Sequence, residues 1–153
     1  MTDVPYGRGG SPLQNLILRG HHETMISALR MESEMDSGPV YLKRPLSLEG
    51  RAQEIFERAA IIVFDMIENL VAAEPTAVLQ SGDPLLFTRR TPEQSRLPEA
   101  GDSRRLFDFI RMLDADTYPQ GFIEYGSWRL EFSHAELTGE TVETRVTFKP
   151  RRG

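Results

Sequence analysis

The chain has 153 residues, of which 39% are hydrophobic and 27% charged, a composition typical of a globular domain with a packed core. It contains no cysteine, which excludes disulfides, thiol catalysis and thiolate-bound zinc and fits a cytoplasmic location. Its net charge of −5 gives no electrostatic footprint for nucleic acid, and no apolar run is long enough to predict a membrane-spanning helix.

A glycine-rich loop opens the chain and runs into a short helix. Pro12 fits the first position of this helix and Gly20 its end. Ser11 fits the N-cap, where its hydroxyl accepts a hydrogen bond from an early backbone N–H. Such a loop is able to bind an anion through its backbone N–H groups. The spacing of its glycines matches neither a Walker loop nor a dinucleotide-binding motif, and the alternative is a purely structural turn. The candidate loop residues are Gly7, Arg8, Gly9, Gly10 and Ser11.

Two strands follow, predicted over residues 24–31 and from residue 40. Asp36 lies between them, in a turn over residues 36–39. A carboxylate placed directly after a strand can orient a histidine, accept a proton or stabilise a cation. The alternative is a local hydrogen bond within the turn, which Asp-Ser-Gly sequences commonly make.

The longest helix is predicted over residues 47–73, because apolar side chains recur there at helical spacing. Two prolines and a glycine in residues 74–84 then indicate a linker. We therefore expect an α/β fold with two parts. Residues 1–75 form the front part, and residues 76–153 form a small α+β, strand-rich module.

The second part contains a short strand over residues 85–88 and a helix around residues 106–113. A hairpin signal spans residues 122–132, with a two-residue turn at 126–127. Alternation over residues 142–148 predicts a last strand.

Other polar and aromatic residues are weaker candidates. The chain has three histidines, His21, His22 and His134. No further metal ligand lies near them in the sequence at a suitable spacing, so no metal site is predicted. Five arginines form either a phosphate-binding patch or an ordinary charged surface: Arg89, Arg90, Arg96, Arg104 and Arg105. Three aromatic residues line either a ligand face or a packed core: Phe122, Tyr125 and Trp128.

The ordered set of motifs resembles the formyltetrahydrofolate-dependent formyltransferases. The segment over residues 2–13 is similar to the family's His-x-Ser-x-Leu-Pro loop, which continues with an Arg-Gly stretch and a helix-opening proline. Asp36-Ser37-Gly38 matches the family's Asp-x-Gly after a strand, at similar spacing. Residues 107–122 are similar to a segment of the family's C-terminal domain. The chain thus resembles the C-terminal part of a Rossmann-like formyltransferase domain with its following module.

The resemblance implies a catalytic trio of Asn, His and Asp, of which this chain supplies the Asp as Asp36. That carboxylate would orient the histidine while an amine attacks the formyl carbon, and the Asn would stabilise the oxyanion. The loop from Gly7 to Ser11 would adjoin this site. Aligning Thr2 with the family's Ser places the histidine one position before Met1, so this chain alone is expected to be inactive.

The resemblance also implies 10-formyltetrahydrofolate as co-substrate and an amine as acceptor. A tRNA reader needs a basic face, and this chain is acidic, so we favour a small amine or a sugar nucleotide over methionyl-tRNA. The alternative is a non-catalytic remnant that binds or self-associates through an exposed apolar face or sheet edge, which predicts a homodimer.

Overall fold

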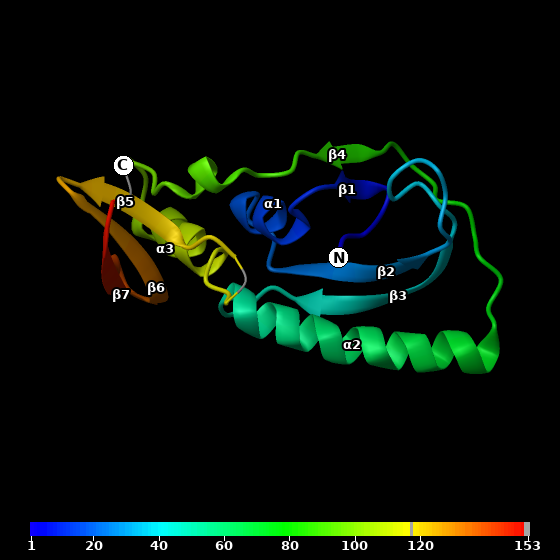
Figure 1. The fold of residues 1–153 in the computed structure, drawn as a ribbon. Coiled ribbons are helices and arrows are strands. Elements are labelled where there is room, and N and C mark those ends of the chain that lie inside the picture. The colour runs from blue at the N-terminus through cyan, green and yellow to red at the C-terminus, as the bar shows by residue number, and fades with distance from the viewer. Residues whose placement is uncertain (117, 152–153) are drawn as a thin grey trace. The chain divides into compact units, whose positions relative to one another are not determined.

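The computed structural model describes residues 1–116 and 118–151, and the chain divides into two compact units (Figure 1). Unit 1 combines Met1–Glu49 with Glu54–Arg90, and unit 2 combines Gly50–Gln53 with Thr91–Gly153. The mixed α/β architecture agrees with the predicted fold class. Within the described residues, no helix is long and apolar enough to cross a membrane.

Unit 1 begins with a small parallel pair of strands. β1 (Tyr6–Gly9) pairs with β4 (Leu85–Phe87), and α1 (Pro12–Leu18) follows β1 directly. The register of β1 shifts between Tyr6 and Arg8, which marks a bulge at Gly7. The predicted glycine-rich loop is therefore in large part a strand, because β4 supplies a backbone partner from far along the chain.

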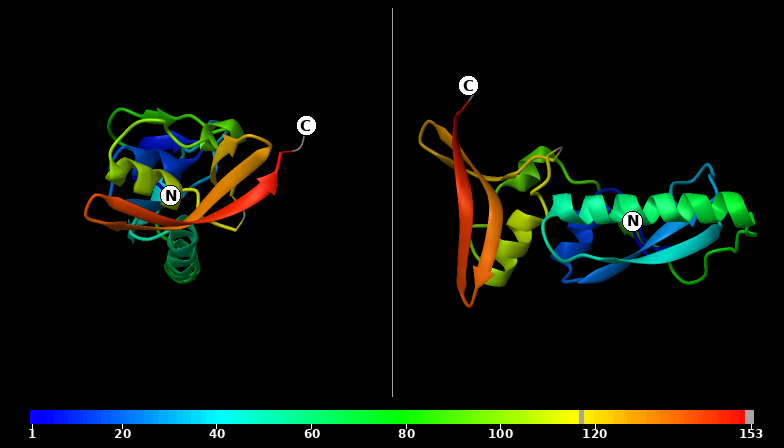
Figure 2. Two further views of the ribbon diagram at one scale, coloured as in Figure 1. Left: turned by 90° about the vertical axis from the view of Figure 1, so that its left-hand side faces the viewer. Right: turned by 90° about the horizontal axis from the view of Figure 1, so that it is seen from below.

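A hairpin and a long helix complete unit 1. β2 (Glu23–Leu29) pairs antiparallel with β3 (Val40–Ser47), and α2 (Ala52–Ala73) runs alongside this hairpin (Figures 1 and 2). The core contains aliphatic side chains from all of these elements: Leu13, Leu16, Ile17, Ile26, Leu46, Leu48, Ile55, Ala59 and Met66. The prediction that Ser47 starts the helix is wrong, since Ser47 ends β3 opposite Glu23 and the helix begins at Ala52.

Unit 2 is a three-stranded antiparallel sheet with one helix packed on it. β5 (Gly121–Tyr125), β6 (Trp128–Thr138) and β7 (Thr141–Pro150) lie in that order, and the hairpin turn at 126–127 agrees with the prediction. A 3-10 turn, η1 (Pro92–Ser95), precedes α3 (Ser103–Arg111). α3 packs against β6, and their shared core includes Ile110, Leu113, Phe122 and Ala135.

The division between the units falls at Arg90 and Thr91, whereas the sequence pattern predicted it after residue 75. Residues 76–90 belong to unit 1 for two physical reasons. β4 pairs with β1, and Val78 exchanges backbone hydrogen bonds with Val40 at 2.7 and 2.9 Å. A stretch rich in proline and glycine is thus bound to the front unit along its length.

Candidate active site

Asp36 lies beside the glycine-rich segment, as the family resemblance implied. The backbone N–H of Gly9 in β1 donates a hydrogen bond to Oδ2 of Asp36 at 2.9 Å. Asp36 occupies the turn between β2 and β3 and has a left-handed backbone, with a φ of 56°. Its half-buried carboxylate can therefore hold a fixed direction in space.

Two glycines make this approach possible. Gly9 has a φ of 108°, and a Cβ there would lie 2.4 Å from the backbone oxygen of Phe87 in β4. A Cβ on Gly38, two residues after Asp36, would lie 1.8 Å from the backbone oxygen of Arg30. Any side chain at either position would separate segments that the site needs in contact.

A small cavity of about 70 Å³ adjoins the carboxylate. It is lined by the start of the chain, by β1 and by the end of β2, and the lining includes Met1, Thr2, Gly9, Ser27 and Asp36. The Ser27 hydroxyl donates to the Thr2 backbone oxygen at 2.8 Å, which fixes the first residues along β2. Burial lowers the pKa of the Met1 α-amino group below 8.0, and the negative charge of Asp36 opposes this shift.

The remaining loop residues have structural partners. Ser11 does not cap α1 through its side chain; its Oγ accepts from the backbone N–H of Arg90 at 3.0 Å, and its φ is 50°. Ser11 does occupy the predicted N-cap position, but the predicted side-chain cap is absent, because the hydroxyl accepts from a tertiary partner instead. Arg8 donates from Nε and Nη2 to Oε1 of Gln80, at 3.1 and 2.8 Å.

Gln80 is a site residue that the sequence did not indicate. It lies in the stretch interpreted as a linker, and a single glutamine there carries no recognisable signal. Its Nε2 donates to the backbone oxygens of Asp36 and Gly38, at 2.8 and 2.7 Å. The turn that carries the carboxylate is thus tied to β1 through one side-chain amide.

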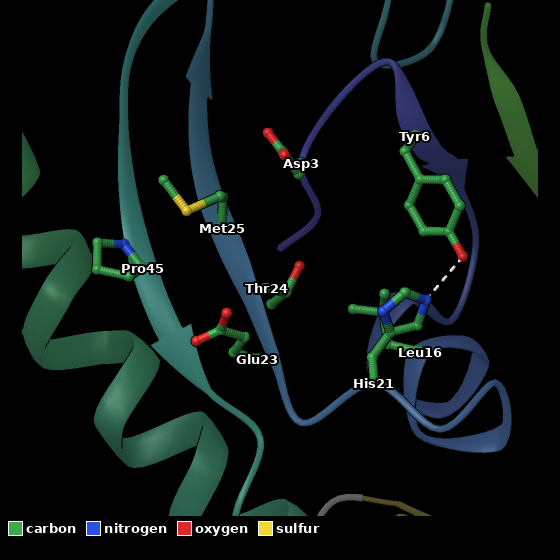
Figure 3. A pocket seen from close by; sticks show the side chains of 8 residues that line it. All are labelled: Asp3, Tyr6, Leu16, His21, Glu23, Thr24, Met25 and Pro45. Carbon is green, nitrogen blue, oxygen red and sulfur yellow. Dashed lines mark hydrogen bonds between the residues drawn. The ribbon is translucent and has the colours of Figure 1, made fainter.

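A larger pocket of about 390 Å³ lies in unit 1 beside the first half of β2 (Figure 3). The side chains of Tyr6 and His21 lie together in one wall of the pocket, and Tyr6 Oη and His21 Nε2 are hydrogen-bonded at 2.8 Å. The pocket is also lined by Asp3, Glu23 and Thr24. Among the described residues β2 pairs only with β3, so the pocket follows its unpaired edge. His21 is half-buried in this wall, while His22 is exposed.

The other sequence candidates are divided between the two units. Arg89 and Arg90 belong to unit 1, whereas Arg96 and Arg104 belong to unit 2 and form ion pairs with Glu124 and Asp108. Phe122 is buried and lies under the Arg129 guanidinium, 3.5 Å from its ring centre. Tyr125 and Trp128 are paired across the hairpin and exposed. His134 is exposed at the surface.

Comparison with known proteins defines the class of this fold. Residues 92–149 match the family model described as "Methionyl-tRNA formyltransferase, C-terminal domain". The solved methionyl-tRNA formyltransferase from Clostridium thermocellum is 46% identical, with a TM-score of 0.96 over 99% of this chain and 67% of that one. The chain belongs to the formyltransferase family and corresponds to its C-terminal part, as the motifs predicted.

Two further proteins show how much of the chain and of its fold is shared with known formyltransferases. A methionyl-tRNA formyltransferase from Streptococcus pyogenes is 27% identical over 157 aligned positions, covering 97% of this chain and 50% of the relative. The chain therefore spans about half the length of that curated relative. An N-formyltransferase from Helicobacter canadensis, solved with folinic acid and dTDP-3-aminofucose, shares the fold with a TM-score of 0.56 at 9% identity.

Proposed function

We propose that this chain carries the carboxylate part of a formyl-transfer site, with Asp36 as its catalytic residue. The observation that carries this proposal is the hydrogen bond from Gly9 N–H to Asp36 Oδ2. It fixes a half-buried carboxylate beside the segment that matches the family's active-site loop. The donor is a folate, 10-formyltetrahydrofolate, and the acceptor is an amine.

The chemistry explains why a held carboxylate is needed. Attack of an amine on the formyl carbon creates an oxyanion and a nitrogen that must lose a proton. A histidine takes that proton best when a carboxylate fixes its tautomer and orientation. The family resemblance places the histidine next to Met1, and Met1 and Asp36 line the same small cavity. This proximity supports Asp36 as the histidine's partner.

The charge distribution supports a small amine, such as an amino-sugar nucleotide, over tRNA as acceptor. The chain carries a net charge of −5. In unit 2, four cations on or next to the sheet lie beside carboxylates: Arg96 and Arg151 pair with Glu124, and Arg129 and Lys149 pair with Glu131. A nucleic acid is bound by Lys and Arg side chains that neutralise its phosphates and so release the counterions condensed on it, and a cation already paired with a carboxylate does this less well. The alternative acceptor is methionyl-tRNA, which the names of the relatives specify.

A formyl-transfer assay tests this proposal. The chain is compared with a fusion in which the unmatched N-terminal part of the Clostridium relative precedes Met1. Formyltetrahydrofolate is the donor, with dTDP-3-aminofucose and methionyl-tRNA as acceptors. We expect the fusion to turn over, with the sugar nucleotide preferred, and Asp36→Ala to lower kcat about 10²- to 10⁴-fold. An active Asp36→Ala fusion contradicts the catalytic assignment, and preference for methionyl-tRNA contradicts the acceptor.

Self-association is the second function that an observation favours. Alternation along β6 and its register place Tyr125, Trp128, Val146 and Phe148 on one face of the sheet. The three aromatic side chains are 71%, 43% and 58% exposed. If two copies pack face to face, these side chains and their half-buried neighbours lose a total of about 1,000 Å² of accessible surface. This buried area is at the lower end of the range for specific interfaces. A second copy of this chain is therefore the occupant that we propose for this face.

A further inference from the structure

We propose that Gln80 is a positioning residue for Asp36, acting through the backbone of the Asp36 turn. This inference rests on the proposed role of Asp36 in formyl transfer. Gln80 lies between α2 and β4 and contacts neither the carboxylate nor the cavity beside it. Its effect on the reaction is therefore indirect, through the place and direction of the Asp36 side chain.

The Gln80 side-chain amide uses both of its ends. Nε2 donates to the backbone oxygens of Asp36 and Gly38, and Oε1 accepts two hydrogen bonds from Arg8. A primary amide has two N–H donors and one carbonyl acceptor with two lone pairs, so these four bonds saturate it. Arg8 is the neighbour of Gly9 in β1, so this strand is linked to the Asp36 turn in two ways. Gly9 binds the carboxylate directly, and Arg8 is linked to the backbone of the turn through Gln80.

The Asp36 turn needs such a restraint. A left-handed backbone is unfavourable for an aspartate, and the segment before it is exposed, with Met31 at 91% and Met35 at 68%. Buried apolar contacts therefore do little to hold the segment. The backbone bridge between Val40 and Val78 brings residue 80 alongside the turn. The hydrogen bonds from Gln80 and Gly9 then set where the carboxylate lies.

Three substitutions separate this role from general support of the fold. Gln80→Ala removes both halves of the bridge. Gln80→Glu keeps the acceptor for Arg8 but loses the N–H donors and places a negative charge against two backbone oxygens. The matched control is Ser37→Ala, which removes a hydrogen bond from Ser37 Oγ to Glu34 within the same turn but leaves β1 untouched.

Hydrogen exchange of the Gly9 amide, measured by NMR on this chain, tests the positioning directly. In Gln80→Ala and Gln80→Glu we expect this amide to exchange roughly fivefold to tenfold faster, as one hydrogen bond is weakened. Ser37→Ala should leave it unchanged. Unchanged exchange in both Gln80 variants, or equal acceleration in Ser37→Ala, overturns the inference.

Turnover of the active fusion separates this inference from the proposed function. Both Gln80 variants should lower kcat about 10- to 100-fold with the acceptor KM within about twofold, because a misplaced carboxylate affects chemistry more than binding. If Asp36→Ala abolishes turnover and the Gln80 variants keep it, the positioning role is overturned and the proposed function stands. If Asp36→Ala leaves turnover intact, the proposed function fails, and the Gly9 exchange still decides what Gln80 does.

Discussion

Gly9 and Asp36 are joined by a hydrogen bond from a backbone N–H to a carboxylate, at 2.9 Å. β1 also pairs with β4 at this point, and a Cβ on Gly9 would lie 2.4 Å from the backbone oxygen of Phe87. Replacement of Gly9 by alanine should lower the free energy of unfolding by about 2–4 kcal/mol, since a Cβ would overlap the Phe87 backbone oxygen in a left-handed conformation. Urea unfolding followed by circular dichroism measures this change.

Gly20 provides the matched control for that substitution. Its φ is 77°, so alanine there carries the same kind of backbone strain, but a Cβ would meet nothing within 4 Å. We expect Gly20→Ala to cost about 1 kcal/mol. Equal losses for the two variants would mean that backbone strain alone, and not the approach of β4, explains the glycine at position 9.

The sequence predicted the local elements of this site better than the contacts between them. The strand before Asp36, the turn around it and the hairpin at 126–127 follow from alternation and turn chemistry, which act between near neighbours. The Asp36 contact with the glycine-rich segment followed only from the family resemblance. The pairing of β1 with β4 and the contact between Arg8 and Gln80 join residues more than seventy positions apart, and Gln80 lies 44 positions from Asp36. No local pattern marks such partners, so a bound segment resembled a linker.

Phe87 anchors that segment to unit 1. It is 4% exposed, its ring contacts Tyr6 edge-on at 5.5 Å, and the Arg19 guanidinium lies 4.6 Å from its centre. Phe87→Ala should lower the stability of unit 1 by about 3–5 kcal/mol. The midpoint of urea unfolding by circular dichroism should fall, while fluorescence of Trp128 in unit 2 should move less.

Leu86 is the control for Phe87, because it is the preceding residue of β4 and 71% exposed. Leu86→Ala should change the free energy of unfolding by no more than about 0.5 kcal/mol. A Phe87→Ala variant that shifts Trp128 fluorescence as much as circular dichroism would argue that the two units unfold as one.

The Met1 α-amino group reports on the charge of Asp36. Burial lowers its pKa below 8.0 and the Asp36 charge raises it, so Asp36→Asn should lower the pKa further. The unfolded chain then binds this proton more tightly than the folded chain, and stability should rise with pH between the lowered pKa and 8.0. Competitive acylation across pH, on protein whose mass retains Met1, measures the pKa. A higher pKa in Asp36→Asn contradicts the proximity.

The apolar face of the unit 2 sheet predicts concentration-dependent association. Trp128 and Phe148 meet edge-on at 6.4 Å between ring centres near the end of this face that carries the 126–127 turn, and both are exposed. If two copies pack face to face, the double substitution Trp128→Ser and Phe148→Ser removes two of the three exposed aromatic side chains of this face and should give a monomer in sedimentation equilibrium at concentrations where the original chain dimerises. Leu86→Ser, which alters a still more exposed apolar residue in unit 1, should leave the dimer intact. A chain that stays monomeric at high concentration would remove the support for self-association and leave the face without a proposed occupant.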